Sequence, residues 1–386
     1  MGSNPPHPIK QRIMKLKKLF CCIATTFFVI SNAACAPSTQ GDKMEQNAVQ
    51  LSEGGKNKIR LMNYLQNEVW GKSTLSGQMD LTWADKIDML KKVYDSTGKY
   101  PAISGYDFMN VGLGWDGARQ TQEALNWWKD AKGTGKHGIV TFCWHWRDPN
   151  KSGGDFYAEK IAFRIPMKDG KLNTASRDFK KIQRDLDKVA AELATLRDQE
   201  VPILWRPMHE AGGDPLYNNP WFWWGASGNN KTERATAYKA LYTYMHNYFT
   251  NEKALDNLIW VWNGQVKEYY PGDEYVDIIA EDIYPNPKDY SSQKTKFNNA
   301  KKYTTANKMI ALSENGVIPH PKNMEKDNVQ WLWFMTWNDG NQKGTNNSNF
   351  WEGEYYNPDS HKKEVYSHKK IITLDQLPDL QNYPIE

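Results

Sequence analysis

The chain has 386 residues, enough for one large domain or two ordinary ones. Its formal net charge is +4, but residues 1–35 hold five of the 49 basic side chains and no acid, which leaves 44 basic against 45 acidic ones. A nearly neutral remainder gives no reason to expect a nucleic-acid-binding protein. The 17 tryptophans and 20 tyrosines exceed what packing requires and suggest stacking on flat apolar faces, which sugar rings present.

Residues 1–35 are predicted to be an N-terminal extension and a signal peptide. Met14 is the more natural start of this signal, lysines follow it, and an apolar stretch covers residues 19–30. That stretch is too short for a stable membrane span. Ala33-Ala34-Cys35 resembles a bacterial lipoprotein cleavage site at which Cys35 would be acylated, and we favour this over simple cleavage after Ala36. We therefore expect a periplasmic or outer-membrane lipoprotein, and otherwise a secreted protein.

The next segment is predicted to be a tether. Residues 36–56 are small, polar and charged without periodicity, so they are expected to be flexible. The folded domain is predicted to cover residues 57–386. Its one cysteine is Cys143, so no internal disulfide is available there.

Short apolar runs recur along the folded domain and predict eight strands. Helical segments lie between several of them: residues 176–197 place an apolar stripe on one face behind a Ser176 cap, and residues 85–94 and 232–249 also show helical patterns. The predicted strands are Thr74–Asp80, Tyr100–Phe108, Gly138–Trp146, Pro202–Glu210, Asn257–Gly264, Val276–Tyr284, Lys308–Gly316 and Trp331–Asp339.

This alternation predicts the α/β class and a single (β/α)8 TIM barrel, whose active site would lie at the C-terminal ends of the strands. A doubly wound open sheet is the competing architecture, but no glycine-rich nucleotide loop follows the first strand. The polar and aromatic residues at the predicted strand ends are Asp80, Asp107, His145, Glu210, Asn263, Tyr284, Glu314 and Trp337. No metal-ligand spacing is present, so no cofactor and no metal are predicted.

Two of these strand ends carry a glutamate. Glu210 ends an apolar run within Pro202–Gly213, and Glu314 ends another within Lys308–Gly316. Glycoside hydrolysis requires one carboxylic acid to protonate the leaving oxygen and a second carboxylate beside the sugar. A single glutamate of this kind is usually a solvated loop acid, but two at strand ends favour a catalytic pair.

Three motifs resemble those of one family of retaining glycosidases. They are Arg206-Pro-Met-His-Glu210, Trp221-Phe-Trp-Trp224 and Leu312-Ser-Glu-Asn-Gly316. Most of the wider clan has Asn before the acid/base residue, and His209 stands there in this chain, as in glycoside hydrolase family 26. The resemblance runs from Ile59 to Pro378 and implies endo-β-1,4-mannanase activity.

The resemblance implies a role for each matching residue. It makes Glu210 the general acid/base and Glu314 the nucleophile, with His209 beside the sugar at the cleavage point. His145 matches the family's third-strand histidine, and Tyr284 matches its sixth-strand tyrosine near the nucleophile.

Three further residues are predicted to bind substrate. Trp221 resembles a tryptophan that stacks on the substrate, although residues 214–220 separate it from the catalytic motif more widely than in many members. Trp337 lies near a strand tip and is a stacking candidate, whereas Trp331 and Trp333 on the same strand face are predicted to be packing. Arg206 shares a side of an ideal strand with Glu210 and is interpreted either as a structural ion-pair partner or as a substrate ligand.

The predicted substrate is mannan, galactomannan or glucomannan, and no nucleic acid is expected as a partner. The same scaffold also hosts mixed-linkage β-glucanases and β-1,3-xylanases, so mixed-linkage β-glucan and β-1,3-xylan are alternative substrates. A non-catalytic glycan-binding protein is a third hypothesis, favoured by the aromatic surplus and the lipoprotein-like leader. The presence of two carboxylates argues against it. The oligomeric state cannot be read from the sequence.

Overall fold

The computed structural model describes residues 50–81, 87–113, 117–213, 219–339 and 349–385. The predicted signal peptide with Cys35, and residues 36–49 of the predicted tether, lie outside this part of the chain. No helix within the described ranges is both long and apolar enough to cross a membrane.

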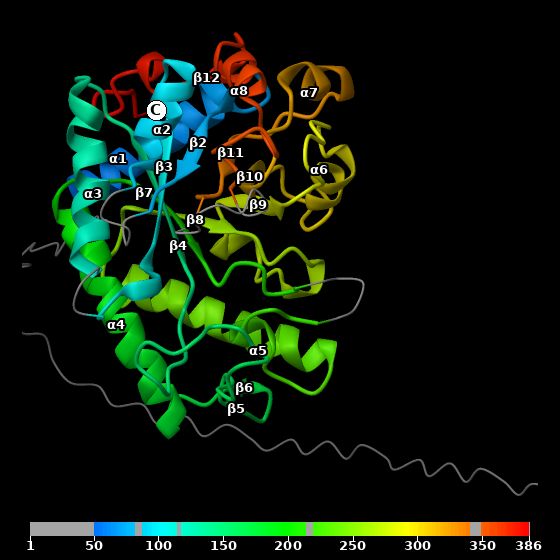
Figure 1. Cartoon of the computed structure of the whole chain (residues 1–386). Coiled ribbons are helices and arrows are strands. Elements are labelled where there is room, and N and C mark those ends of the chain that lie inside the picture. The colour runs from blue at the N-terminus through cyan, green and yellow to red at the C-terminus, as the bar shows by residue number, and fades with distance from the viewer. Residues whose placement is uncertain (1–49, 82–86, 114–116, 214–218, 340–348, 386) are drawn as a thin grey trace, which may run out of the picture. The chain divides into compact units, whose positions relative to one another are not determined.

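Eight parallel strands close into a barrel, which confirms the predicted (β/α)8 architecture (Figure 1). Around the barrel the strand order is β10-β11-β2-β3-β4-β7-β8-β9. The bounds are β2 (Gly77–Met79), β3 (Ile103–Asp107), β4 (Ile139–Trp144), β7 (Ile203–Pro207), β8 (Leu258–Trp262), β9 (Ile278–Ile283), β10 (Met309–Asn315) and β11 (Phe334–Thr336).

The barrel strands are continuous apolar runs because both of their faces are covered. Every residue of β4 and of β8 is buried, as expected for parallel strands with side chains packed inside the barrel and helices outside it. All eight predicted strands are present. The first is split at Ser76, so that β1 (Thr74–Leu75) pairs in parallel with β12 (Ile371–Ile372) outside the barrel, and only β2 joins it.

Helices follow most of the barrel strands, and α3 and α4 lie side by side along the barrel (Figure 1). The helix bounds are α1 (Glu53–Tyr64), α2 (Met89–Thr97), α3 (Gly117–Asp130), α4 (Arg177–Asp198), α5 (Lys231–Asn247), α6 (Lys294–Ala300), α7 (Pro321–Asp327) and α8 (Asp359–Tyr366). The Ser176 hydroxyl caps α4 by accepting a hydrogen bond from the Phe179 N–H, as predicted.

The helix predicted over residues 85–94 lies further along the chain. It is α2, which begins after its N-cap Asp88, and its buried residues are Met89, Leu90 and Val93. Tyr94, one turn after Leu90, is 45% exposed, and its ring stacks on that of Tyr100.

The end of the predicted tether is helical. α1 begins at Glu53, capped by Ser52, and buries Leu61 and Tyr64. This helix packs against β8 and α4. The described connection between β8 and β9 has only the 3-10 turns Lys267–Tyr269 and Asp273–Tyr275 in place of an α-helix. α1 therefore covers a part of the barrel for which the β8–β9 connection supplies no α-helix. Composition alone does not predict this packing.

A long connection of residues 145–176 joins β4 to α4. It contains an antiparallel hairpin of β5 (Met167–Lys168) and β6 (Lys171–Leu172), seen beside α5 in Figure 1. Its earlier part carries Phe156 and Tyr157, which reach the strand ends described below.

We predict that Leu186→Ala, on the buried face of α4, lowers the free energy of unfolding by about 2–5 kcal/mol, because it removes a fully buried side chain and leaves a cavity. Urea denaturation followed by circular dichroism measures the change. Leu51→Ala is the matched control, since Leu51 is 39% exposed and its loss should cost no more than about 0.5 kcal/mol. Equal effects of the two substitutions would contradict this packing.

Candidate active site

Glu210 sits on a tight turn beyond the end of β7. Met208 and Glu210 both have a φ of +51°, in the left-handed region that side chains avoid at a cost of about 1–3 kcal/mol. The turn is anchored to the end of β8, because the Glu210 N–H donates to the Asn263 carbonyl at 3.0 Å. It is also held from outside, where the Trp224 indole donates to the His209 carbonyl at 2.8 Å and the Tyr238 hydroxyl to that of Met208 at 3.1 Å.

Glu314 lies at a register shift in β10. The pairing of β10 with both of its neighbours, β9 and β11, is irregular after Leu312. In a regular strand successive side chains point to opposite faces, but Ser313 and Glu314 both reach the same polar cluster. The irregularity thus turns the Glu314 carboxylate toward the strand ends, as β-bulges next to active sites commonly do.

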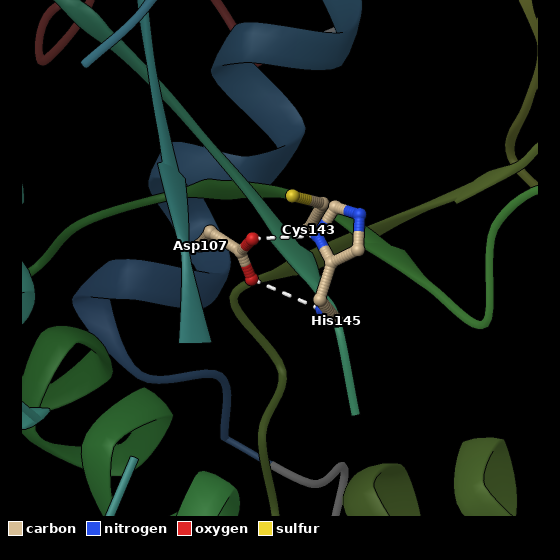
Figure 2. Close-up of side chains that lie close together, drawn as sticks. All are labelled: Asp107, Cys143 and His145. Atoms are coloured by element: carbon tan, nitrogen blue, oxygen red, sulfur yellow. Dashed lines mark hydrogen bonds and ion pairs between the residues drawn. The ribbon is translucent and has the colours of Figure 1, made fainter. Parts of the chain in front are cut away.

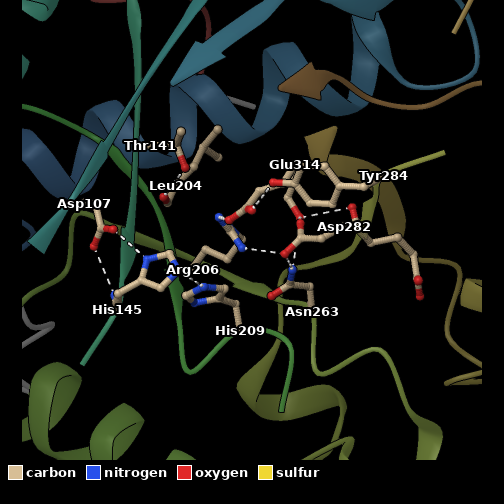
Figure 3. A network of polar contacts seen from close by, with 12 residues as sticks. Asp107, Thr141, His145, Leu204, Arg206, His209, Asn263, Asp282, Tyr284 and Glu314 are labelled. Carbon is tan, nitrogen blue, oxygen red and sulfur yellow. Dashed lines mark hydrogen bonds and ion pairs between the residues drawn. The ribbon is translucent and has the colours of Figure 1, made fainter. Parts of the chain in front are cut away.

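A buried arginine holds Glu314 in place (Figure 3). Arg206 forms ion pairs with Glu314 and with Asp282, the latter at 3.0 Å, and its side chain is 3% exposed. Burial alone would lower the pKa of Arg206, but the charges of the two carboxylates outweigh burial and raise it. Arg206 is therefore a permanent cation beneath the site.

Further polar side chains complete this cluster. Asp282 accepts hydrogen bonds from Asn263 at 2.5 Å and from the Ser313 hydroxyl at 2.6 Å. The Tyr284 hydroxyl donates to Oε2 of Glu314 at 2.7 Å, while Arg206 occupies Oε1. Both oxygens of Glu314 are thus held by hydrogen-bond donors.

The two glutamates that the sequence predicts as a pair lie close together. One carboxylate oxygen each of Glu210, Asp282 and Glu314 lies within 4.8 Å of the others. Burial raises the pKa of Glu210 well above its ordinary value, and the charges of Asp282 and Glu314 raise it further. The arrangement therefore favours a protonated Glu210 facing a Glu314 whose oxygens are held by donors.

Asp107 fixes the ring of His145 (Figure 2). The carboxylate accepts the His145 backbone N–H at 3.0 Å and contacts its ring Nδ1 at 2.6 Å. Burial alone would lower the pKa of His145, but the charge and the hydrogen bond of Asp107 raise it above its ordinary value. On its other side, Nε2 of His145 lies 3.1 Å from Nε2 of His209.

His209, which contacts His145, is neutral. Burial, followed by the charges of His145 and Arg206, lowers the pKa of His209 well below its ordinary value. Its Nδ1 is buried without a hydrogen-bond partner in the described part of the chain. Only one proton can lie between the two Nε2 atoms, so the contact with His145 fits a neutral His209.

A cleft of about 390 Å³ opens above these groups. This volume falls within the range of about 300–1,000 Å³ typical of ligand sites. The residues that line it are Asp107, Met109, His145, Phe156, Tyr157, Glu210, Trp221, Phe222, Tyr284, Glu314 and Trp337.

Six of the eight predicted site residues line this cleft, namely Glu210, Glu314, His145, Trp221, Tyr284 and Trp337. Trp221 is 41% exposed, so a ring face is available for stacking. Trp331 and Trp333 are 0% and 1% exposed and form packing, as predicted. Of the long connection before Trp221, residues 214–218 lie outside the described part of the chain.

The other two predicted site residues, Arg206 and His209, lie below the cleft surface. Arg206 does not share a side with Glu210, because β7 ends at Pro207 and the turn breaks the alternation; it binds the nucleophile candidate instead. His209 is fully buried, with its ring packed against His145, Phe222 and Trp224. Both support residues that face the cleft rather than facing it themselves.

Sequence reasoning left several cleft residues without a role. Asp107 was placed at a strand end, but its bond to His145 depends on the register of β3 with β4, in which Asp107 pairs with Cys143. Phe222 belongs to the aromatic motif Trp221-Phe-Trp-Trp224, and Phe156 comes from the connection between β4 and α4. No signal in the sequence separates these rings from the core tryptophans beside them.

Two groups of side chains have the composition of metal ligands among the described residues. In the first, Asp107, Cys143 and His145, the carboxylate is already bonded to the imidazole. The second group consists of Glu210, Asp282 and Glu314. There the guanidinium of Arg206 supplies the positive charge that a metal would bring. Both donor sets are engaged with protein groups.

The sequence from residue 51 to residue 376 matches the family model of glycosyl hydrolase family 26. The chain belongs to this family. The resemblance expected from the three motifs is thereby confirmed over nearly the whole described part of the chain.

Curated relatives resemble this chain at moderate identity. Mannan endo-1,4-beta-mannosidase B of Piromyces sp is 34% identical over 83% of this chain and 52% of its own length. The chain spans about half the length of such relatives, since mannan endo-1,4-beta-mannosidase A of Piromyces sp is covered to 54%.

Two solved structures share the barrel. A β-(1,4)-mannanase of Podospora anserina has a TM-score of 0.70 and 30% identity, with 84% of this chain and 68% of that chain covered. A β-mannanase from a symbiotic protist of the termite Reticulitermes speratus, complexed with gluco-manno-oligosaccharide, has a TM-score of 0.68 and 32% identity, with 86% and 96% covered. Both support the (β/α)8 fold.

We predict that Asp282→Asn lowers the pKa of Glu210. The negative charge of Asp282 disfavours ionisation of Glu210, and its removal also leaves Arg206 freer to stabilise the Glu210 carboxylate. Titration of the Glu210 side-chain carboxyl by carbon NMR, with Glu210→Gln to assign the signal, measures the shift.

Glu281→Gln is the matched control for this prediction. Glu281 is the preceding residue on β9 and is also buried, but it accepts a hydrogen bond from the Tyr303 hydroxyl, and its charge is not among the main causes of the shifted pKa of Glu210. The Glu210 titration should stay near that of the wild type. An unchanged pKa in Asp282→Asn would show that this charge does not reach Glu210.

Proposed function

We propose that this chain is a retaining glycoside hydrolase that cleaves β-1,4-mannosidic bonds in mannan, galactomannan or glucomannan. One observation carries the mechanism: carboxylate oxygens of Glu210 and Glu314 lie within 4.8 Å of each other. Retaining enzymes hold their carboxyl groups about 5–5.5 Å apart, whereas inverting enzymes need about 6.5–9.5 Å to admit a water. The spacing favours direct attack by one carboxylate.

In the first step Glu314 attacks the anomeric carbon. The bond from that carbon to the glycosidic oxygen breaks, and this oxygen keeps the electron pair and takes the proton of Glu210. The raised pKa of Glu210 supports this role, because the group must carry a proton near neutral pH. The product is a sugar ester on Glu314 and a shortened leaving chain.

In the second step water replaces Glu314. Glu210, now ionised, removes a proton from the water as its oxygen bonds to the anomeric carbon, and the ester bond to Glu314 breaks. The departing carboxylate returns to the donors Arg206 and Tyr284. Two displacements at one carbon leave the anomeric configuration unchanged.

The substrate class rests on the family members. The relatives from Piromyces are mannan endo-1,4-beta-mannosidases, and the two neighbouring structures are mannanases, one with a gluco-manno-oligosaccharide. These names favour mannan over the mixed-linkage glucan and β-1,3-xylan that the sequence left open. Paired carboxylates at retaining distance favour an enzyme over a glycan-binding protein.

We predict that Glu314→Ala loses mannan hydrolysis to background, because no carboxylate remains to form the ester. Glu210→Ala should lose about 10²–10⁴-fold on mannan but far less on an aryl β-mannoside, whose acidic phenol leaves without protonation. Reducing-end release and phenol release are the two measurements.

Tyr94→Ala serves as the surface control, since Tyr94 on α2 is 45% exposed and lies outside the cleft lining. It should match the wild type on both substrates. Mannan hydrolysis by Glu314→Ala at more than trace rates would refute the double displacement.

We also propose that residues 1–35 direct export and that Cys35 is acylated, which would attach the protein to a membrane. The basic start, the short apolar stretch and Ala33-Ala34-Cys35 support this. Expressed in a bacterial host fed labelled fatty acid, the full chain should take up label and Cys35→Ala should not. Equal labelling of the two would leave simple cleavage and secretion as the better account.

A further inference from the structure

The segment that follows β8 lies directly against the turn that carries Glu210. The Glu210 N–H donates to the Asn263 carbonyl at 3.0 Å. Two residues further along, the Gly212 N–H donates to the Gly264 carbonyl, also at 3.0 Å. A Cβ added at Gly212 would lie 2.2 Å from a methyl carbon of Val266, so no side chain fits between the two segments there. The placement of the segment after β8 therefore decides what Glu210 meets on this side.

Gln265, in the middle of this segment, contacts Glu210 itself. Its side chain hydrogen-bonds to the Glu210 carboxyl. Burial and the charges of Asp282 and Glu314 raise the pKa of Glu210, and this hydrogen bond acts in the opposite direction. An amide N–H can donate to a carboxyl oxygen in both protonation states, so the contact can persist while Glu210 gives up and regains its proton. Gln265 is not among the residues that line the cleft, which separates this role from substrate binding.

The backbone of Gln265 is strained and needs support. Its φ is +59°, in the left-handed region that residues other than glycine keep only where the surrounding structure holds them. The support comes from Tyr303, which precedes β10 and whose hydroxyl lies 2.9 Å from the Gln265 carbonyl oxygen. The ring of Tyr303 packs edge-on against Trp262 of β8 at 5.3 Å between centroids, and this packing fixes the direction of the hydroxyl.

The Tyr303 hydroxyl has a second partner, Glu281 of β9, whose Oε1 lies 2.6 Å away. A hydroxyl carries one proton and cannot donate to both oxygens. Glu281 is 1% exposed, and burial raises its pKa to about 7, so below neutral pH its carboxyl carries a second proton. Glu281 then donates to the Tyr303 oxygen, and Tyr303 donates to the Gln265 carbonyl. Glu281→Gln preserves this order, because an amide N–H takes the place of the carboxyl O–H.

We propose that Tyr303 is a positioning residue for proton transfer by Glu210: it holds the Gln265 backbone so that the Gln265 amide stays against the Glu210 carboxyl. The inference rests on the proposed function, in which Glu210 protonates the leaving oxygen. A general acid must lie within about 2.6–3.2 Å of the atom that receives its proton, so a displaced carboxyl transfers the proton less well. Tyr303 thus acts on catalysis from outside the cleft lining.

The test is Tyr303→Phe, which removes the hydroxyl and keeps the ring. We expect kcat/KM on mannan to fall about five- to tenfold, the effect of one hydrogen bond, through kcat and with KM unchanged. On the aryl β-mannoside, whose phenol leaves without protonation, kcat/KM should stay near that of the wild type. The ratio of the two kcat/KM values is the readout, because a loss of folded enzyme lowers both equally.

Gln265→Met tests the path of the effect. It removes the amide at nearly the same side-chain length and should lower the ratio at least as much as Tyr303→Phe. Because Tyr303 acts through Gln265, the double variant should lose no more than Gln265→Met alone. A double variant whose loss is the product of the two single losses would overturn this path.

Tyr270→Phe is the matched control. The Tyr270 ring also packs edge-on against Trp262, at 5.0 Å between centroids, but its hydroxyl donates to Asp273. Its ratio should equal that of the wild type, and thermal unfolding of each variant checks that it is folded. A wild-type ratio in folded Tyr303→Phe overturns the proposal. Failure of the wild type to hydrolyse mannan overturns the proposed function itself, so the two failures are distinct.

Discussion

The site depends on one buried cation. Arg206 bridges Asp282 and Glu314 at the barrel end, where three buried carboxyl groups would otherwise face each other. Removing one partner of such a buried pair is expected to cost about 3–5 kcal/mol, because the other charge is left without compensation. The cluster therefore sets both the position of Glu314 and the charge that Glu210 experiences, while Glu210 forms no ion pair within the described part of the chain.

Much of the fold could be predicted from the sequence, since parallel barrel strands are apolar on both faces and stand out as runs such as Ile139–Trp144. The closeness of Glu210 and Glu314 could also be predicted, because a carboxylate ends each of two such runs. The hydrophobic periodicity of the sequence does not predict the backbone geometry beyond the end of a strand. The left-handed Met208 and Glu210, and the irregular pairing of β10, decide where side chains point, and neither has a pattern in the sequence.

The aromatic surplus divides into two uses that composition does not distinguish. Trp224 is fully buried and holds the Glu210 turn through the His209 carbonyl, whereas Trp221, three residues earlier, is exposed in the cleft lining. Neighbouring rings of one motif thus serve as scaffold and as contact surface. Trp224 lies in the short 3-10 turn Trp223–Gly225, whereas Trp221 precedes this turn. Tertiary placement, more than residue type, assigns the role.

The position of α1 has a consequence for the order in which the molecule can assemble. Its cap, Ser52, bonds to Asp256, 204 residues later, and Asn57 bonds to the Glu200 carbonyl, 143 residues later. During synthesis this helix is made before the barrel strands, yet its hydrogen-bond partners Glu200 and Asp256 come much later. A lone helix of its length is marginal in water. It can therefore take its place only after residues 200–256 have been made.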